Sequence, residues 1–122
     1  MEGGKKTWYF PDGYLPAKNP DSAMIAHEAL MLFNTHDKPV DVKIDVYYSD
    51  RDPVKDIPVT VPPERIISLR MDLAEDLGGH QIPLLTQYAL RIRASEPIVV
   101  QFGRLDTTQS NMSYYLGAGW CE

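Results

Sequence analysis

The feature that most constrains the fold is an alternation of apolar and polar residues with a period of two. It is clearest in the run VDVKIDVYYSD, where valine and isoleucine alternate with aspartate and lysine. This pattern is typical of a β-strand with one face in the core and the other in water. The expected buried positions are Val40, Val42, Ile44 and Val46, and the expected solvated positions are Asp41, Lys43 and Asp45.

Segment 27–34 (HEALMLFN) has the length of a short strand. It ends at the turn-forming cluster NTHDKP and leads directly into the alternating strand, so we expect the two to form an antiparallel hairpin. Further along, Pro62 and Pro63 divide segment 57–73 into two short strands, because proline removes a donor from the hydrogen-bond ladder.

Segments 87–94 and 98–105 are predicted to form two more strands, on either side of a turn at SEP. Segments 6–16 and 112–120 add a strand at each end of the chain, and 74–85 is expected to be a loop with one helical turn. The chain therefore contains about eight short strands at spacings typical of a β-sandwich or barrel. The sequence predicts an all-β fold.

Composition and charge narrow the range of functions. A chain of 122 residues is long enough for one domain with a real core and hardly for two. The formal net charge of -5 repels phosphate backbones, so we expect DNA binding to be weak at most. The single cysteine, Cys121, suits a reducing cytosol, and the N-terminal stretch lacks the long apolar segment of a signal peptide. These features predict a cytoplasmic protein.

The sequence offers little for metal or nucleophilic chemistry. His27 and Glu28 are neighbours on a predicted strand and point to opposite faces, so they are not expected to bind one metal ion together. His27 is interpreted as a strand-end histidine held by a hydrogen bond. Cys121 lies near the end of the chain, and the sequence has no Gly-x-Ser-x-Gly motif. We therefore expect a protein that is not an enzyme, with no cofactor and no metal site.

The stretch EPIVVQFGRLDTTQ places three polar side chains at the end of an apolar strand. Arg104 shares a strand face with Asp106, whereas Gln101 points the opposite way, and Arg70 and Asp72 repeat the Arg-x-Asp spacing. One interpretation is structural: ion pairs that join strand ends, or a subunit interface. The other is a polar pocket that reads hydroxyl or acid groups of a small ligand. Spacing alone favours the structural interpretation.

A guanidinium at the end of an apolar strand is partly desolvated, and a desolvated charge without a partner is costly. We therefore expect Arg104 to lie within hydrogen-bond reach of a carboxylate, with His27 or Trp8 nearby. The candidate partners are Asp106, Glu28 and Asp72.

Six motifs, in order, resemble the sensory rhodopsin transducer family of small soluble bacterial proteins: TWYFPDGYLP, HEALMLFN, VYYSDRDPV, TVPPER, LRMDL and IVVQFGRLDTTQ. The resemblance covers a core of about 7–109 within one domain of 1–122, and the tail 110–122 is more variable and more aromatic. It implies a β-sandwich of jelly-roll character, a homotetramer and a cytoplasmic location. It further implies a protein partner, which is either a membrane photoreceptor (a sensory rhodopsin) or another signalling protein. It also implies binding of a small molecule such as a sugar.

The resemblance further predicts ligand-binding residues: Trp8, His27, Glu28, Asn34, Tyr48, Arg70, Gln101, Arg104 and Asp106. The predicted function is a non-enzymatic sensory module that binds a small molecule and relays its state through protein contacts. The alternatives are a structural oligomeric scaffold and a transcription-associated regulator that binds DNA.

Overall fold

The computed structural model describes residues 3–109 and 111–122. Within these residues the chain forms eight strands and one short 3-10 helix. They are β1 (Lys5–Tyr14), β2 (His27–Asn34), β3 (Val40–Tyr48), β4 (Val54–Val61), β5 (Arg65–Arg70), η1 (Ala74–Leu77), β6 (Gln87–Asp106), β7 (Ser113–Gly117) and β8 (Trp120–Cys121). In the part of the chain described, no helix has the length and apolar character needed to cross a bilayer.

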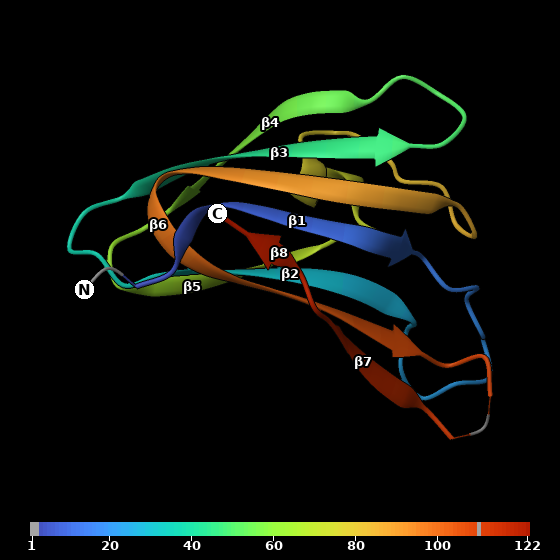
Figure 1. The fold of residues 1–122 in the computed structure, drawn as a ribbon. Helices are drawn as coiled ribbons and strands as arrows, with labels where there is room; N and C mark the ends of the chain where they lie inside the picture. Colours follow the sequence, from blue (N-terminus) through green and yellow to red (C-terminus); the bar gives the residue numbers. More distant parts are fainter. Residues whose placement is uncertain (1–2, 110) are drawn as a thin grey trace.

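The strands form two antiparallel layers that share β6. In the upper layer of Figure 1, here sheet A, the order is β4-β3-β6-β1-β8, and in the lower layer, sheet B, β2 lies between β5 and β6 and β7 flanks β6 on the other side. The first half of β6 pairs with β1 and β3, and its second half pairs with β2 and β7. The predicted all-β sandwich is confirmed.

The predicted turn that separates two strands at SEP is wrong, because β6 is one strand of 20 residues. Figure 1 shows it curving over from the upper layer into the lower one. The pairing with β3 ends at Ala94, and the pairing with β2 begins at Val99. Pro97 lies in this interval, so its missing N–H group removes no bond from either ladder. A bend between two layers has the same local sequence signals as a turn.

The predicted hairpin of 27–34 with 40–48 is also wrong, although both segments are strands. β2 lies between β5 and β6, whereas β3 lies between β4 and β6, so the connection crosses from one layer to the other. The buried Asn34 holds this crossing: its amide donates to the carbonyls of Lys38, Val61 and Pro62, and its oxygen accepts from the amide of His36.

The core lies between the two layers, and the expected alternation is confirmed for the apolar positions. Val40, Val42, Ile44 and Val46 are all buried. Phe10 of β1 stacks on Phe102 of β6 with ring centroids 5.8 Å apart. The break at the proline pair and the helical turn at 74–77 are confirmed as well, whereas the single strand expected over 112–120 is two strands, β7 and β8.

Asp45 is the exception, because it was expected in water and is fully buried. Arg91 Nε donates to its Oδ2 and Arg93 Nη2 donates to its Oδ1, both at 2.8 Å, and the Asp56 amide donates at 2.9 Å. Burial raises the pKa of Asp45, but these hydrogen bonds outweigh it and leave the pKa below its ordinary value. The two arginines on the neighbouring strand cover a position that the alternation alone assigns to solvent.

Candidate functional site

Arg104 meets the buried carboxylate of Glu28 at one end of the sandwich. Arg104 Nε donates to Glu28 Oε2 at 2.8 Å, and the Tyr88 hydroxyl donates to Oε1 at 2.6 Å. The Tyr14 amide donates to both carboxylate oxygens, at 3.0 and 3.1 Å. The expected carboxylate partner of Arg104 is therefore Glu28, while Asp106 accepts from the amide and hydroxyl of Thr108.

This Glu28 cluster draws on three strands and both layers. Desolvation raises the pKa of Tyr88 well above its ordinary value, and the charge of Glu28 raises it further. For Arg104, desolvation lowers the pKa, but the hydrogen bond to Glu28 outweighs it and the pKa is raised. Glu28 is fully buried and accepts from three donor groups, which satisfies it without any ligand. The geometry favours the structural interpretation for Arg104.

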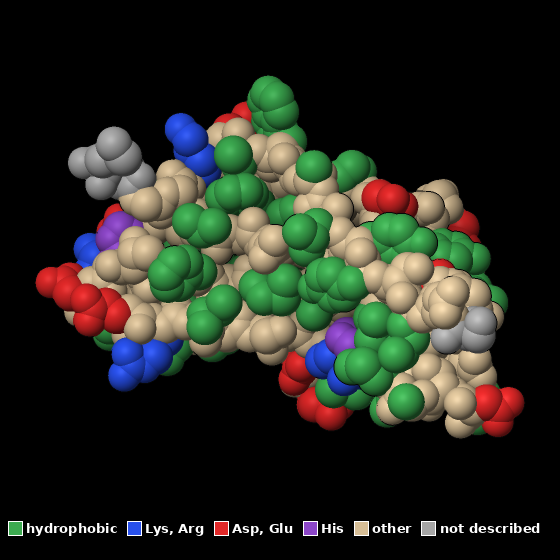
Figure 2. Space-filling view, turned by 90° about the horizontal axis from the view of Figure 1, so that it is seen from below, with side chains coloured by type: hydrophobic (Ala, Val, Ile, Leu, Met, Phe, Trp, Pro, Cys, Tyr) green, Lys and Arg blue, Asp and Glu red, His purple; other side chains and the backbone are tan. Residues whose placement is uncertain are grey.

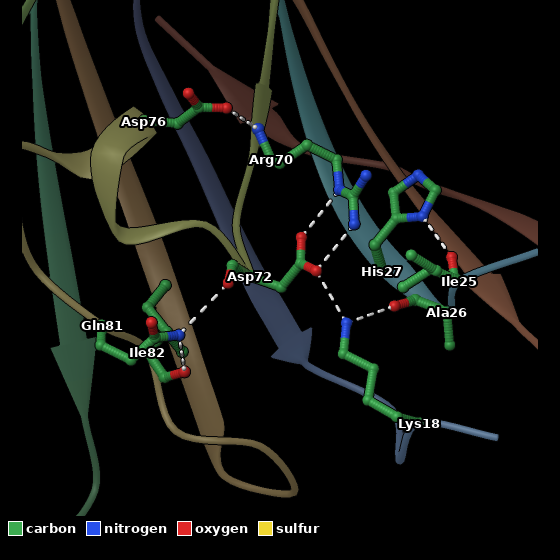
Figure 3. Close-up of polar contacts among 9 residues, drawn as sticks. All are labelled: Lys18, Ile25, Ala26, His27, Arg70, Asp72, Asp76, Gln81 and Ile82. Carbon is green, nitrogen blue, oxygen red and sulfur yellow. Dashed lines mark hydrogen bonds and ion pairs between the residues drawn. The ribbon is translucent and has the colours of Figure 1, made fainter. Parts of the chain in front are cut away.

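The second Arg-x-Asp pair lies at the end of β5 and forms a clamp with Lys18. Arg70 donates through Nε and Nη2 to the two oxygens of Asp72, at 2.8 and 2.7 Å. Lys18 Nζ donates to Asp72 Oδ2 and to the carbonyl of Ala26, both at 2.7 Å. Figure 3 shows Lys18 and Arg70 approaching the Asp72 carboxylate from two sides. This clamp, defined as Lys18, Arg70 and Asp72, joins the loop after β1 to the end of β5.

The surroundings of the clamp hold it in place. Asp76 in η1 accepts from the backbone amide of Arg70 at 2.8 Å, and Gln81 donates to the carbonyl of Asp72 at 3.3 Å. The Asp72 side chain is only 6% exposed. Burial raises the pKa of Asp72, but the hydrogen bonds from Arg70 and Lys18 outweigh it and lower the pKa to about 2. Asp72 is therefore ionised over the whole physiological pH range.

A hollow of about 520 Å³ opens beside the clamp. Its polar side is the clamp, and its remaining wall comes from the loop between β1 and β2 and from the residue after Asp72. The lining residues are Lys18, Asn19, Pro20, Ser22, Met24, Ile25, Arg70, Asp72 and Leu73. The side chains of Met24 and Ile25 are 51% and 63% exposed, so apolar surface faces water next to charged groups. A volume in this range fits a small molecule.

The other predicted ligand-binding residues are spread over the molecule. The Trp8 indole donates to the Lys5 and Ile98 carbonyls, Asn34 braces the crossing between layers, and the Tyr48 hydroxyl is 2.6 Å from Nε2 of His80. Gln101 is exposed on the outer face of sheet B.

Of the predicted ligand-binding residues, Glu28 and Arg104 therefore bond to each other. The structure places Arg70 in the clamp, next to which the His27 ring bonds the carbonyl of Ile25 at 2.7 Å, as expected for a strand-end histidine.

The sequence reasoning did not include Lys18 and Asp72 in the predicted ligand site. Asp72 was visible as part of an Arg-x-Asp pair, but Lys18 lies in the segment PAKNPDSA, which carries no signal beyond that of a surface loop. Only the path of the loop across the end of β5 brings Lys18 to Asp72. In the residues that the structure describes, no group of three or more histidine, cysteine, aspartate or glutamate side chains is arranged to hold a metal ion.

Comparison with known proteins gives a consistent result. Residues 3–121 match the family described as "Anabaena sensory rhodopsin transducer". Among solved structures, Thermotoga maritima 1070 is 30% identical, with a TM-score of 0.85, covering 100% of this chain and 97% of that one. The Anabaena sensory rhodopsin transducer is 34% identical, with a TM-score of 0.70, covering 84% of this chain and 98% of that one. No curated protein gives a significant match.

Proposed function

The chain belongs to the Anabaena sensory rhodopsin transducer family, and from this premise we propose that it is a non-enzymatic signalling module that binds a small molecule in the hollow beside the clamp. Membership supports a transducer-like role. The observation that carries the ligand proposal is the placement of Arg70, Asp72 and Lys18 at the edge of a hollow of about 520 Å³. Pre-oriented charged groups beside apolar walls are typical of small-molecule sites.

The position of the clamp also supports a relay through protein contacts. Lys18 belongs to a loop, whereas Arg70 ends a strand, so a ligand that contacts both changes how the loop is held. The next residue, Asn19, donates to the carbonyl of Thr107, which follows the end of β6. A change in the loop thus reaches the segment that leads into β7. We propose that partners read the ligand state from this end of the molecule.

A thermal-shift screen with sugars and small acids tests the ligand proposal. A ligand that binds only the folded chain, present at about a hundred times its Kd, stabilises by about 2.7 kcal/mol and raises Tm by roughly 10 °C. We expect Arg70→Gln and Lys18→Met to reduce this shift. Arg65→Gln is the control, because Arg65 lies at the other end of the same strand and is exposed. If no compound raises Tm, or if the shift survives in both clamp variants, the proposal is wrong.

We also propose that the module assembles as a homotetramer through the outer face of sheet B. Ile66, Phe33 and Val99 lie side by side on three neighbouring strands and are 60%, 42% and 40% exposed. Figure 2 shows hydrophobic side chains gathered over the middle of this face, with charged side chains mainly around its margin. An exposed apolar face of this kind favours association, although the net charge of -5 on each chain opposes it.

Light scattering tests the assembly. We expect a particle of four chains for the native sequence and smaller particles for Phe33→Glu. Leu84→Glu is the matched control, because Leu84 is equally exposed at 42% but lies in the loop between η1 and β6. A monomer at micromolar concentration, or a tetramer that Phe33→Glu leaves unchanged, would contradict this assignment.

For the cellular context, we propose a cytoplasmic location and a protein partner. The name of the Anabaena relative connects that protein with a sensory rhodopsin. For this chain we propose a membrane photoreceptor or another signalling protein as partner, with DNA binding weak at most because of the acidic total charge. A scaffold role is the second candidate function, and the Glu28 cluster favours it because that cluster is complete without a ligand. Co-purification with a photoreceptor and a DNA-binding assay at physiological salt distinguish a protein partner from DNA.

A further inference from the structure

The clamp contains hydrogen-bond donors that its own contacts do not use. Arg70 uses Nε and Nη2 for Asp72, and within the described part of the chain its third nitrogen, Nη1, has no partner. Lys18 uses two of its three N–H bonds, for Asp72 and the Ala26 carbonyl. The two side chains are 30% and 39% exposed, so an incoming molecule can reach the remaining donors.

The clamp also carries an excess positive charge. It contains two cations and one carboxylate, which leaves one positive charge. Asp21 and Asp76, the neighbouring carboxylates in the sequence, are not among the residues that line the hollow. Asp76 bonds the backbone amide of Arg70, and Figure 3 shows it on the other side of that residue from Lys18. Besides the hydrogen bond to Asp72, the charge of Asp76 contributes to the raised pKa of Arg70 and so offsets part of this excess, but its carboxylate does not line the hollow, where the clamp presents two cations and one carboxylate.

The rest of the wall is mainly apolar. Pro20, Met24, Ile25 and Leu73 line the hollow together with the polar residues Asn19 and Ser22. Two of them, Met24 and Ile25, expose half or more of their side chains. Covering such surface stabilises a complex, because apolar area is removed from water. A molecule that fits the hollow thus has an apolar body as well as a polar head.

We infer that the hollow takes a small monocarboxylate whose apolar body lies against Met24 and Ile25 and whose carboxylate accepts from Arg70 and Lys18. This inference rests on the proposed small-molecule binding and names the chemical class of the ligand. A single negative charge matches the single excess positive charge of the clamp. A neutral head group leaves that charge unpaired as water is excluded, and a dianionic phosphate brings one negative charge too many.

Three compounds with the same apolar body and different head groups test the inference: hexanoate, hexanamide and hexyl phosphate. Their affinities for the intact chain are measured by calorimetry or by ligand-observed NMR at pH 7. We expect hexanoate to bind at least tenfold more tightly than hexanamide and more tightly than hexyl phosphate. Acetate, which has the head group without the body, should bind more weakly than hexanoate. Equal or tighter binding of the amide or of the phosphate overturns the carboxylate assignment.

Variants locate the binding. Lys18→Met keeps the aliphatic stem and removes the ammonium group, so we expect the preference for hexanoate over hexanamide to fall several-fold. Lys55→Met is the control, because Lys55 lies on β4 and faces the ring of Tyr47. Met24→Ser should weaken all three hexyl compounds and leave the preference among them unchanged. Circular dichroism checks that each variant is folded, and a preference that is unchanged in folded Lys18→Met overturns the inference.

The failure of this inference can be told apart from failure of the proposed function. If a neutral sugar from the screen stabilises the chain in a manner that depends on Arg70, and hexanoate does not bind, the small-molecule function stands and the carboxylate class is wrong. If neither the screen nor hexanoate gives a response, both are wrong.

Discussion

The substitution Arg104→Ala tests whether the Glu28 cluster holds the fold together. It removes the guanidinium that bonds Glu28 at 2.8 Å and leaves a carboxylate with no solvent exposure. Breaking a buried pair from one side costs about 3–5 kcal/mol, because the other charge stays buried. The Tyr14 amide and the Tyr88 hydroxyl still donate to Glu28, so we expect the lower end, about 3 kcal/mol.

Urea denaturation at one fixed protein concentration measures this loss. We expect a lower midpoint with an unchanged m-value, and a fall in Tm of roughly 10 °C. Arg51→Ala is the control, since Arg51 and its partner Asp50 have side chains 46% and 61% exposed, and it should lower the midpoint far less than Arg104→Ala does. Arg104→Lys keeps the charge but loses the geometry of the guanidinium, so its stability should lie between that of the native chain and that of the alanine variant.

A double-mutant cycle with Glu28→Gln then isolates the pair. Because both substitutions disrupt the same contact, the double variant should be less destabilised than the sum of the single ones. If Arg104→Ala lowers the midpoint no more than Arg51→Ala does, the cluster is not structural. If in addition the variant loses a ligand response while it keeps its stability, Arg104 belongs to a binding site.

Three further predictions follow from burial and protonation. The pKa of Asp72 is about 2 in the folded chain and 3.8 for a free side chain. Its contribution of about 2 kcal/mol to the free energy of unfolding is therefore present above pH 4 and lost between pH 4 and 2. In a plot of Tm against pH, Asp72→Asn should flatten the fall on the acid side. The pKa of Tyr88 is raised, so its contribution is present below pH 10 and lost above that value, and Tyr88→Phe should remove this alkaline loss. Ile44→Ala should cost about 2–5 kcal/mol in urea denaturation, because Ile44 is fully buried, and a cost below 1 kcal/mol would contradict the observed packing.

The strands and the core could be predicted because they depend on local patterns. Alternation with a period of two marks the buried face of a strand wherever it lies in the sheet, and Val40, Val42, Ile44 and Val46 are buried accordingly. A proline pair ends a strand for a local reason too, since each proline lacks an N–H group. These inferences need no knowledge of which strands are neighbours.

The choice of neighbours was not predictable in this way. The hairpin was inferred from closeness in sequence, but β6 is long enough to pair with β3 along one half and with β2 along the other. The burial of Asp45 depends on the same nonlocal register, because it needs Arg91 directly opposite on β6 and Arg93 nearby. Similarly, Lys18 reaches the clamp through a loop whose path the sequence does not indicate.

The two Arg-x-Asp pairs show why equal spacing leads to different contacts. Arg104 and Asp106 both lie within β6, where residues two apart are separated by nearly 7 Å, and Glu28 lies directly opposite Arg104 on β2. Arg104 therefore bonds across the sheet. β5 ends at Arg70, so the chain is free to turn and Asp72 comes back to the guanidinium. The first pairing is enclosed by both layers, and the second faces an open hollow where a competing anion can reach it. For this reason we propose a structural role for Arg104 and a ligand-binding role for Arg70.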